Sequence, residues 1–337
     1  MNLKTVVVGA GGISNAWFPP LIQEGIEIAA VVDLNIETAR AQIKKYELKA
    51  VASIDLEATL EQHRPDFVID LTIPEAHREV TITALQAGYP VLGEKPMATN
   101  MDDAREMVRI STDTGKMYAV SQSRRWDKNH DILRRTIESG VIGKVTAINC
   151  DFYIGAHFGG FRDEMSSPLL LDMAIHHFDM ARFFTGADPI AVYAKEYNPV
   201  GSWYKGDAAA SCIFEMTDDI VFTYVGSWCS EGCHTSWNGN WRVIGEKGTL
   251  IYEYDKAPYG EVVESDTTDF HRPLKKADIT DSPLEAFGMH GAICEMIDFL
   301  KTGKTPQTEC KDNIKSLAMV FSAIESAKRR QRILVEL

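Results

Sequence analysis

The sequence predicts an α/β protein of two domains: an N-terminal doubly wound parallel sheet, then an α+β domain with a large, mostly antiparallel sheet. Three observations support this prediction. A glycine-rich turn between two apolar strands opens the chain, strands and helices alternate as far as residue 120, and strands then follow one another with few helices between them. A length of 337 residues is also more than one hydrophobic core usually supports.

The first 33 residues have the pattern of a dinucleotide-binding unit. An apolar strand over 5–8 leads into a glycine turn, a helix over 13–24, a second apolar strand over 28–32 and then Asp33. In such a unit the turn and the first amides of the helix face a pyrophosphate, as in the Rossmann fold. The residues expected at the cofactor here are Gly9, Gly11, Gly12, Ile13, Ser14 and Asp33.

The residue types in this turn suit that chemistry. Gly9 allows the tight turn, and Gly11 lets the backbone approach a pyrophosphate. The carboxylate of Asp33 can accept hydrogen bonds from both ribose hydroxyls and would repel a 2′-phosphate, which favours NAD over NADP. Ser14 stands where the pattern usually has a third glycine. A plain strand–helix turn with incidental glycines is the alternative interpretation.

Alternating elements then continue the predicted parallel sheet. Strands are expected over 49–52, 67–72, 91–92 and 117–120, with helices over 36–46, 55–62, 76–87 and 101–114. In such sheets ligands bind beyond the carboxyl ends of the strands. The residues expected at those ends, besides the glycine turn and Asp33, are Thr72, Ile73, Pro74, Glu94, Lys95, Pro96 and Gln122. Taken alone, Glu94 and Lys95 could equally form a surface ion pair. We place the boundary between the cofactor-binding domain, 1–122, and a substrate-binding and oligomerisation domain, 123–337.

The second domain is predicted from strands that succeed one another. These are expected over 144–148, 191–197, 208–216, 220–228, 241–245 and 249–254, with a hairpin turn at 245–248. Helices are expected over 128–139, 284–300 and 312–329, and a final strand over 333–335. The polar stretch 257–282 is expected to be irregular.

One buried helix, over 167–184, interrupts these strands. Ser167 is expected to cap it, and Asp172, His176 and Asp179 recur at a spacing that places them on one stripe. A carboxylate one turn before a histidine can orient the ring for acid–base work. A satisfied buried hydrogen bond is the alternative interpretation. His177 faces another direction and is expected to be a packed core residue.

Composition excludes several classes of function. The formal net charge of −13 leaves no basic surplus for nucleic acid. No apolar run is long enough to span a membrane, and the six scattered cysteines suit a reduced, cytoplasmic protein. Cys229, Cys233 and His234 cluster but lack a fourth ligand, so we expect no metal.

Several motifs in order resemble one family. They are the glycine turn at 9–14, Thr72-Ile73-Pro74 with His77, Glu94-Lys95-Pro96, and Asp172 with His176. With these motifs the chain resembles the glucose-fructose oxidoreductase / inositol dehydrogenase / rhizopine catabolism (Gfo/Idh/MocA) family of NAD(P)-dependent oxidoreductases. It departs from the family at Ser166-Ser167-Pro168, where a glycine cluster is common, and at Ala174, where a glycine is common.

The resemblance implies roles for individual residues. Lys95, Asp172 and His176 would be catalytic, His77 would join the cofactor-binding residues, and Arg124 and His157 would contact substrate hydroxyls. For Arg124 and His157 a structural or solvated role is equally compatible with the sequence. Among the tryptophans that could stack on a sugar, which are Trp203, Trp228 and Trp237, core or interface packing is expected for at least two. The family often pairs subunits through the second sheet, so a homodimer or homotetramer is expected.

The resemblance therefore predicts an NAD-dependent oxidoreductase that acts on a secondary hydroxyl or keto carbon of a sugar, cyclic polyol or glycoside. Three alternatives stay open. The enzyme could be a glycosidase or epimerase that oxidises and re-reduces its substrate with a bound NAD. It could be a non-enzymatic regulator that binds NAD and a sugar, although Lys95 and His176 would then be unnecessary. It could also reduce a different substrate, such as a tetrapyrrole or a dihydrodiol.

Overall fold

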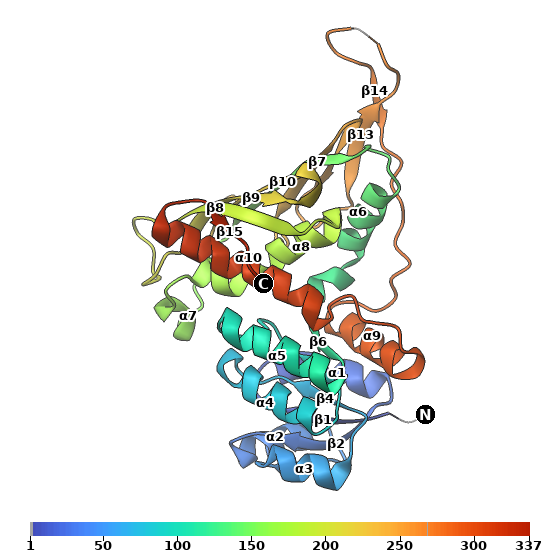
Figure 1. Ribbon diagram of the computed structural model, residues 1–337, viewed down its shortest axis with the longest axis vertical. Helices are drawn as coiled ribbons and strands as arrows, with labels where there is room; N and C mark the ends of the chain where they lie inside the picture. The colour runs from blue at the N-terminus through green and yellow to red at the C-terminus, as the bar shows by residue number, and fades with distance from the viewer. Residues whose placement is uncertain (1–2, 268) are drawn as a thin grey trace. The chain divides into compact units, whose positions relative to one another are not determined.

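The computed structural model describes residues 3–267 and 269–337, and they form two compact units (Figure 1). The first unit comprises the chain up to Trp126 together with Glu285–Ile314, and the second comprises Asp127–Leu284 and Lys315–Leu337. The segment Glu285–Ile314 thus returns to the first unit after the chain has passed through the second. Every helix in the described part of the chain is too short or too polar to cross a lipid bilayer.

The first unit is built on a six-stranded sheet with the order β3-β2-β1-β4-β5-β6. All neighbouring strands in it are parallel, which confirms the predicted doubly wound sheet. The strands are β1 (Lys4–Val8), β2 (Glu27–Val32), β3 (Val51–Ser53), β4 (Phe67–Asp70), β5 (Val91–Gly93) and β6 (Tyr118–Val120). The central strands β1 and β4 are apolar and buried on both faces, as parallel sheets covered by helices require.

Helices alternate with these strands. They are α1 (Ser14–Gln23), α2 (Ile36–Lys45), α3 (Leu56–His63), α4 (Pro74–Gln86) and α5 (Met101–Thr114). Three of them begin where a side-chain oxygen accepts a hydrogen bond from a first-turn amide: Asn35 at α2, Asp55 at α3 and Asn100 at α5. Helix α1 has no such cap.

The returning segment packs closely on the N-terminal part of the first unit. Its helix α9 (Met289–Thr302) packs on α1, and Gly291 lies against the Trp126 ring, where a Cβ atom would be 2.2 Å from the ring. Further along, the amide of Val120 in β6 donates to the carbonyl of Thr308 at 3.1 Å. Late residues therefore complete the packing of both α1 and the edge strand β6.

The second unit is built on a nine-stranded sheet with the order β14-β13-β12-β11-β7-β10-β9-β8-β15. Among its described strands only β7 and β10 pair in parallel, so the expectation of a mostly antiparallel sheet is confirmed. The strands are β7 (Val145–Tyr153), β8 (Pro189–Tyr197), β9 (Ala209–Met216), β10 (Val221–Ser227), β11 (Asn240–Gly245), β12 (Gly248–Tyr252), β13 (Tyr259–Val263), β14 (Leu274–Lys276) and β15 (Ile333–Leu334).

The stretch expected to be irregular holds two of these strands, β13 and β14, so that expectation is wrong. Both strands lie towards one edge of the sheet; β14 is exposed along its length, and β13 has two of its five residues buried. Gly260 lets β13 approach β12, because a Cβ atom there would lie 2.3 Å from the carbonyl oxygen of Thr249.

Helices pack on one face of this sheet. They are α6 (Lys128–Glu138), α8 (Ile175–Thr185), which follows directly on a π-helical segment (Leu169–Ala174), and the part of α10 (Cys310–Arg329) from Lys315 onward. The short helix α7 (Phe161–Glu164) lies in the connection between β7 and the π-helical segment. Aromatic rings fill the interface, for example Phe178 against Phe214 at 4.8 Å between ring centres and Phe184 against Trp241 at 5.1 Å. His177 is fully buried among these rings, as predicted.

Candidate active site

The glycine turn between β1 and α1 is shaped by two steric facts. Gly9 has a φ of +92°, and a Cβ atom on it would lie 2.6 Å from the carbonyl carbon of Leu71, so no other residue fits without a shift. At Gly11 and Gly12 a Cβ atom would meet nothing within 4 Å, so space is open above this backbone. The start of α1 has neither a side-chain cap nor an acidic residue, which leaves the positive end of the helix available to an anion.

Ser14, at the position of the usual third glycine, fits this turn. Its side chain is fully buried, and its hydroxyl donates to the carbonyl of Gly11 at 2.7 Å. The hydroxyl is therefore satisfied inside the turn and does not block the open side. Ile13, the neighbouring residue, is 39% exposed at the helix start.

Asp33 lies at the carboxyl end of β2, and two amides hold its carboxylate. One oxygen accepts from the amide of Ala10 at 2.8 Å and the other from the amide of Asn35 at 2.8 Å. A carboxylate offers about four acceptor positions, so about two stay available for hydroxyl donors. The orientation of Asp33 is thus fixed by the glycine turn itself, and its free acceptor sites suit a ribose diol.

The loops after β4 and β5 are tied together by His77. This buried ring lies between two backbone carbonyls, with Nδ1 2.8 Å from the oxygen of Pro96 and Nε2 3.0 Å from the oxygen of Thr72. Ile73, next to Thr72, is 65% exposed, and Pro74 begins α4. His77 therefore positions the backbone of two cofactor-binding candidates, and Ile73 offers an apolar surface beside them.

Glu94 joins the loop after β5 to α1. Its buried carboxylate accepts from the Trp17 indole at 2.7 Å and from the Lys95 amide at 3.0 Å. Burial raises the pKa of this carboxyl. The Glu94 carboxylate is therefore buried inside the unit and does not lie at the surface. Lys95 itself is half-buried in the same loop.

The carboxyl end of β6 carries an unusual polar side chain. Gln122 is 1% exposed, and neither its amide nitrogen nor its amide oxygen has a hydrogen-bond partner among the described residues. A buried amide is normally satisfied, so this one suits a ligand or an ordered water. Arg124 follows in a 3₁₀ turn (Ser123–Trp126) and is half-buried in the first unit.

In the second unit, Asp172 and His176 lie at a change of helix type. Asp172 belongs to the π-helical segment, and His176 stands in the first turn of α8. Wider helical turns of this kind occur often at functional sites. Both residues are half-buried. Asp179, the third member of the predicted stripe, is fully buried, and its carboxylate accepts from the Ser316 hydroxyl at 2.7 Å, so it anchors α8 to α10.

Ser167 does not cap this helix as expected. Its hydroxyl donates to the carboxylate of Glu196 on β8 at 3.1 Å. Burial raises the pKa of the Glu196 carboxyl to about 7. The helix start is therefore fixed to the sheet by a tertiary contact.

Arg162 is a partner of Asp172 that sequence reasoning missed. Its guanidinium donates to the Asp172 carboxylate at 2.6 Å and also lies over the Phe158 ring at 4.9 Å. The two residues are separated by a loop and Pro168, so no helical spacing relates them. The sequence shows only that Arg162 follows the glycine-rich loop 155–161, which does not by itself relate it to Asp172.

Aromatic side chains surround this loop. His157 stacks on Trp203 with 3.6 Å between ring centres, and its Nε2 lies 2.8 Å from a carboxylate oxygen of Glu231. Packing was expected for at least two of the three tryptophans; Trp228 is buried, Trp203 is half-buried and Trp237 is 45% exposed. The second unit, which carries His176, thus contains flat aromatic rings and a hydrogen-bonded pair formed by His157 and Glu231.

The predicted site residues therefore fall into two sets. The first unit brings together the glycine turn with Asp33, and joins Thr72 and the Glu94–Lys95–Pro96 loop through His77. Within the second unit, Asp172 and His176 are one helical turn apart, and Arg162 joins the loop of His157 to Asp172. The chain segment with Cys229, Cys233 and His234 forms no metal-ligating group in the described part of the structure.

Comparisons with known proteins agree with this geometry. Residues 3–122 match the model of an oxidoreductase family with an NAD-binding Rossmann fold, and residues 130–251 match the GFO/IDH/MocA C-terminal domain. The chain is 26% identical to a 1,5-anhydro-D-fructose reductase of Ensifer adhaerens, over 98% of both chains. It is 29% identical to an inositol 2-dehydrogenase of Paenarthrobacter aurescens, over 66% of each.

A solved structure shows the same fold. An oxidoreductase from Agrobacterium radiobacter, in complex with NAD⁺, L-tartaric acid and magnesium, matches with a TM-score of 0.85 and 22% identity over 99% of both chains. The two family models together cover most of the chain, in the order of its two sheets. The protein therefore belongs to the GFO/IDH/MocA family of oxidoreductases, and its first unit is an NAD-binding Rossmann domain.

Proposed function

We propose that the protein is a dehydrogenase that transfers hydride between NAD and a secondary hydroxyl or keto carbon of a sugar, cyclic polyol or glycoside. One observation supports the assignment for this chain: the glycine turn leaves its backbone open at Gly11 and its Ala10 amide binds the Asp33 carboxylate, an arrangement that suits NAD. The substrate class follows from relatives named as a 1,5-anhydro-D-fructose reductase and an inositol 2-dehydrogenase.

The proposed roles follow from where charge changes during alcohol oxidation. Bound NAD supplies the hydride acceptor. His176 would take the hydroxyl proton as the hydride leaves the same carbon, and Asp172 would stabilise the imidazolium that results. Lys95 would donate to the reacting oxygen and stabilise its developing negative charge. In the direction of reduction the same groups return the proton.

Arg162 adds a positioning role to this proposal. Because its guanidinium is bound to Asp172, it would hold that carboxylate in one orientation relative to α8. Arg124 and His157 are proposed to bind substrate hydroxyls, and the exposed ring of Trp237 offers a flat apolar surface of the kind that suits a pyranose.

Asp33→Ala should weaken NAD binding by about tenfold or more, because a hydrogen bond to a charged group contributes about 1.5–3 kcal/mol. The loss of its negative charge should also reduce the preference for NAD over NADP. Titration of both cofactors, followed by protein fluorescence, measures the ratio of the two dissociation constants. Asp33→Asn is the matched comparison, since it keeps the shape and removes the charge, while one acceptor oxygen becomes an NH2 group. An unchanged ratio in both variants would contradict the role of Asp33.

The direct test of function is NADH absorbance when the purified protein and NAD are mixed with a panel of sugars, cyclic polyols and glycosides. A rise with one compound supports a dehydrogenase and identifies its substrate class. Product analysis of the same samples separates the alternatives. A changed sugar without free NADH would indicate an internal redox cycle instead, and intact compounds throughout would favour a regulator.

We also propose that the protein forms a homo-oligomer through the outer face of the second sheet. On that face Tyr193 of β8 pairs directly with Ile213 of β9, and both are about half exposed. Val221 of β10 adds a further exposed apolar side chain. Exposed apolar side chains on three neighbouring strands of one sheet suit a contact with a second subunit. Light scattering in solution would measure the mass, and a strictly monomeric mass would refute this proposal.

A further inference from the structure

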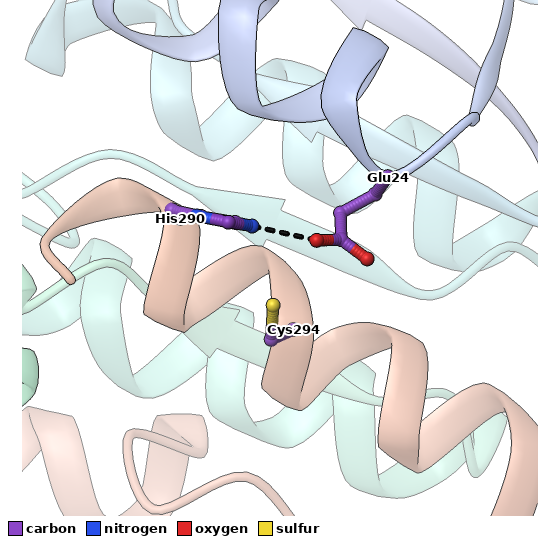
Figure 2. A group of neighbouring side chains, drawn as sticks. All are labelled: Glu24, His290 and Cys294. Carbon is purple, nitrogen blue, oxygen red and sulfur yellow. Dashed lines mark hydrogen bonds and ion pairs between the residues drawn. The ribbon is translucent and has the colours of Figure 1, made fainter. Parts of the chain in front are cut away.

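A second group of chemically reactive side chains lies in the first unit, at the far end of α1 from the glycine turn. Glu24 is the residue that ends α1, and His290 and Cys294 stand one turn apart on α9 (Figure 2). They face one another, and His290 Nε2 lies 2.6 Å from a Glu24 carboxylate oxygen. The proposed hydride transfer uses none of these residues.

We propose that Glu24, His290 and Cys294 bind a divalent transition-metal ion, with Zn²⁺ as the best match. The nitrogen, sulfur and oxygen ligand atoms all lie within 4.8 Å of one another. In a tetrahedral zinc site, with bonds of about 2.0–2.3 Å, neighbouring ligand atoms are about 3.3–3.8 Å apart. The present spacing is therefore within a small side-chain adjustment of that geometry.

The chemical types of the three ligand atoms favour some metal ions over others. Imidazole and thiolate together favour zinc, cobalt or nickel over magnesium or calcium, which prefer oxygen ligands. Ionised Glu24 and a Cys294 thiolate would also neutralise the two positive charges. Without an ion, burial raises the pKa of the Cys294 thiol to about 11, so binding has to displace the thiol proton.

The backbone around the group is already fixed, whereas the side chains stay accessible. Spacing of i and i+4 puts His290 and Cys294 on one face of α9, and this helix packs on α1. The Glu24 amide is bound to the Pro20 carbonyl at 3.0 Å, which holds the end of α1. The side chains of His290 and Glu24 are 21% and 32% exposed, so an ion can reach them and water can complete its coordination.

Such an ion would act as a clamp between two segments that are far apart in sequence. Three protein ligands would join the end of α1 to α9, the helix of the returning segment. The expected consequence is structural, namely a more stable first unit. The site lies at the opposite end of α1 from the glycine turn, so loss of the ion should leave NAD binding by that turn unchanged.

Cobalt is the probe that tests this proposal, because a Co²⁺–thiolate bond gives a near-ultraviolet charge-transfer band that carboxylates and imidazoles alone do not give. The full-length protein, treated with a chelator, should bind one equivalent of Co²⁺ with this band, and Zn²⁺ should displace it. Cys294→Ser should abolish the band. Glu24→Gln and His290→Ala should weaken Co²⁺ binding by at least about tenfold.

Cys233→Ser is the matched control, because Cys233 is an exposed cysteine beside a histidine and should not affect the band. Zn²⁺ should raise the unfolding temperature of the wild type and of Cys233→Ser but not of Cys294→Ser, which also shows whether each variant folds. No charge-transfer band in the wild type, or a band that survives Cys294→Ser, would overturn the proposal. The group would then be a histidine–carboxylate ion pair beside a half-buried thiol.

Discussion

His176→Ala should lower turnover by about 10²- to 10⁴-fold, the usual contribution of a positioned general acid–base residue, while NAD still binds. His176 stands half-buried in the first turn of α8, directly after the π-helical segment that carries Asp172. Its removal should therefore cost little stability compared with its effect on proton transfer. Steady-state kinetics with the substrate found in the panel, together with an NAD titration, measure the two effects separately.

Two controls make this result specific to proton transfer. His63→Ala removes a histidine at the end of α3 and should leave turnover unchanged. In the His176→Ala variant, the pH profile of kcat/KM should lose the limb that reports ionisation of the catalytic base. In the His63→Ala variant, this limb should remain. Near-normal turnover in His176→Ala would remove this residue as the acid–base group and leave the site without an assigned proton acceptor.

Gly9→Ala should abolish NAD binding and destabilise the first unit. The added Cβ atom would lie 2.6 Å from both the carbonyl carbon and the carbonyl oxygen of Leu71, which are backbone atoms and cannot rotate away. In addition, the φ of +92° is unfavourable for a residue with a Cβ atom, at a cost of about 1–2 kcal/mol. Thermal unfolding and an NAD titration give the two readouts.

Gly11→Ala separates the effect on the fold from the effect on the cofactor. A Cβ atom at Gly11 meets no atom within 4 Å, so the unfolding temperature should stay that of the wild type. The same atom would occupy the space where a pyrophosphate approaches the backbone, so NAD affinity should fall strongly. Normal NAD binding by a stable Gly11→Ala variant would mean that the cofactor does not pass over this turn.

The parts of the fold that local rules govern were predictable from the sequence. The strand, glycine turn and second strand up to Asp33 were recognisable because parallel strands are continuously apolar and because the turn requires glycine. Gly186 ends α8 in the left-handed conformation with a φ of +69°, as a helix-ending glycine should. The hairpin between β11 and β12 was likewise evident from its turn residues.

Other features depend on contacts between distant residues, and the sequence did not reveal them. The spacing of Asp172 and His176 indicated an ordinary α-helix, whereas Asp172 lies in a π-helical segment. Its partner Arg162, and the Glu196 partner of Ser167, come from other elements, which no periodicity relates to the helix. Strand β13 was missed because its short apolar part is interrupted by Gly260 and Glu261 and lies within a mainly polar stretch of sequence.

The return of Glu285–Ile314 to the first unit has a consequence for how the protein is made. A ribosome synthesises the chain from the N-terminus, and domains usually fold in that order. Here the nucleotide-binding domain begins first, yet α9 and the Thr308 carbonyl, which complete its packing, emerge only after the whole segment Asp127–Leu284. During translation the glycine turn and all six strands of the Rossmann sheet are therefore present long before the packing of their domain is finished, since α9 and the Thr308 carbonyl arrive last.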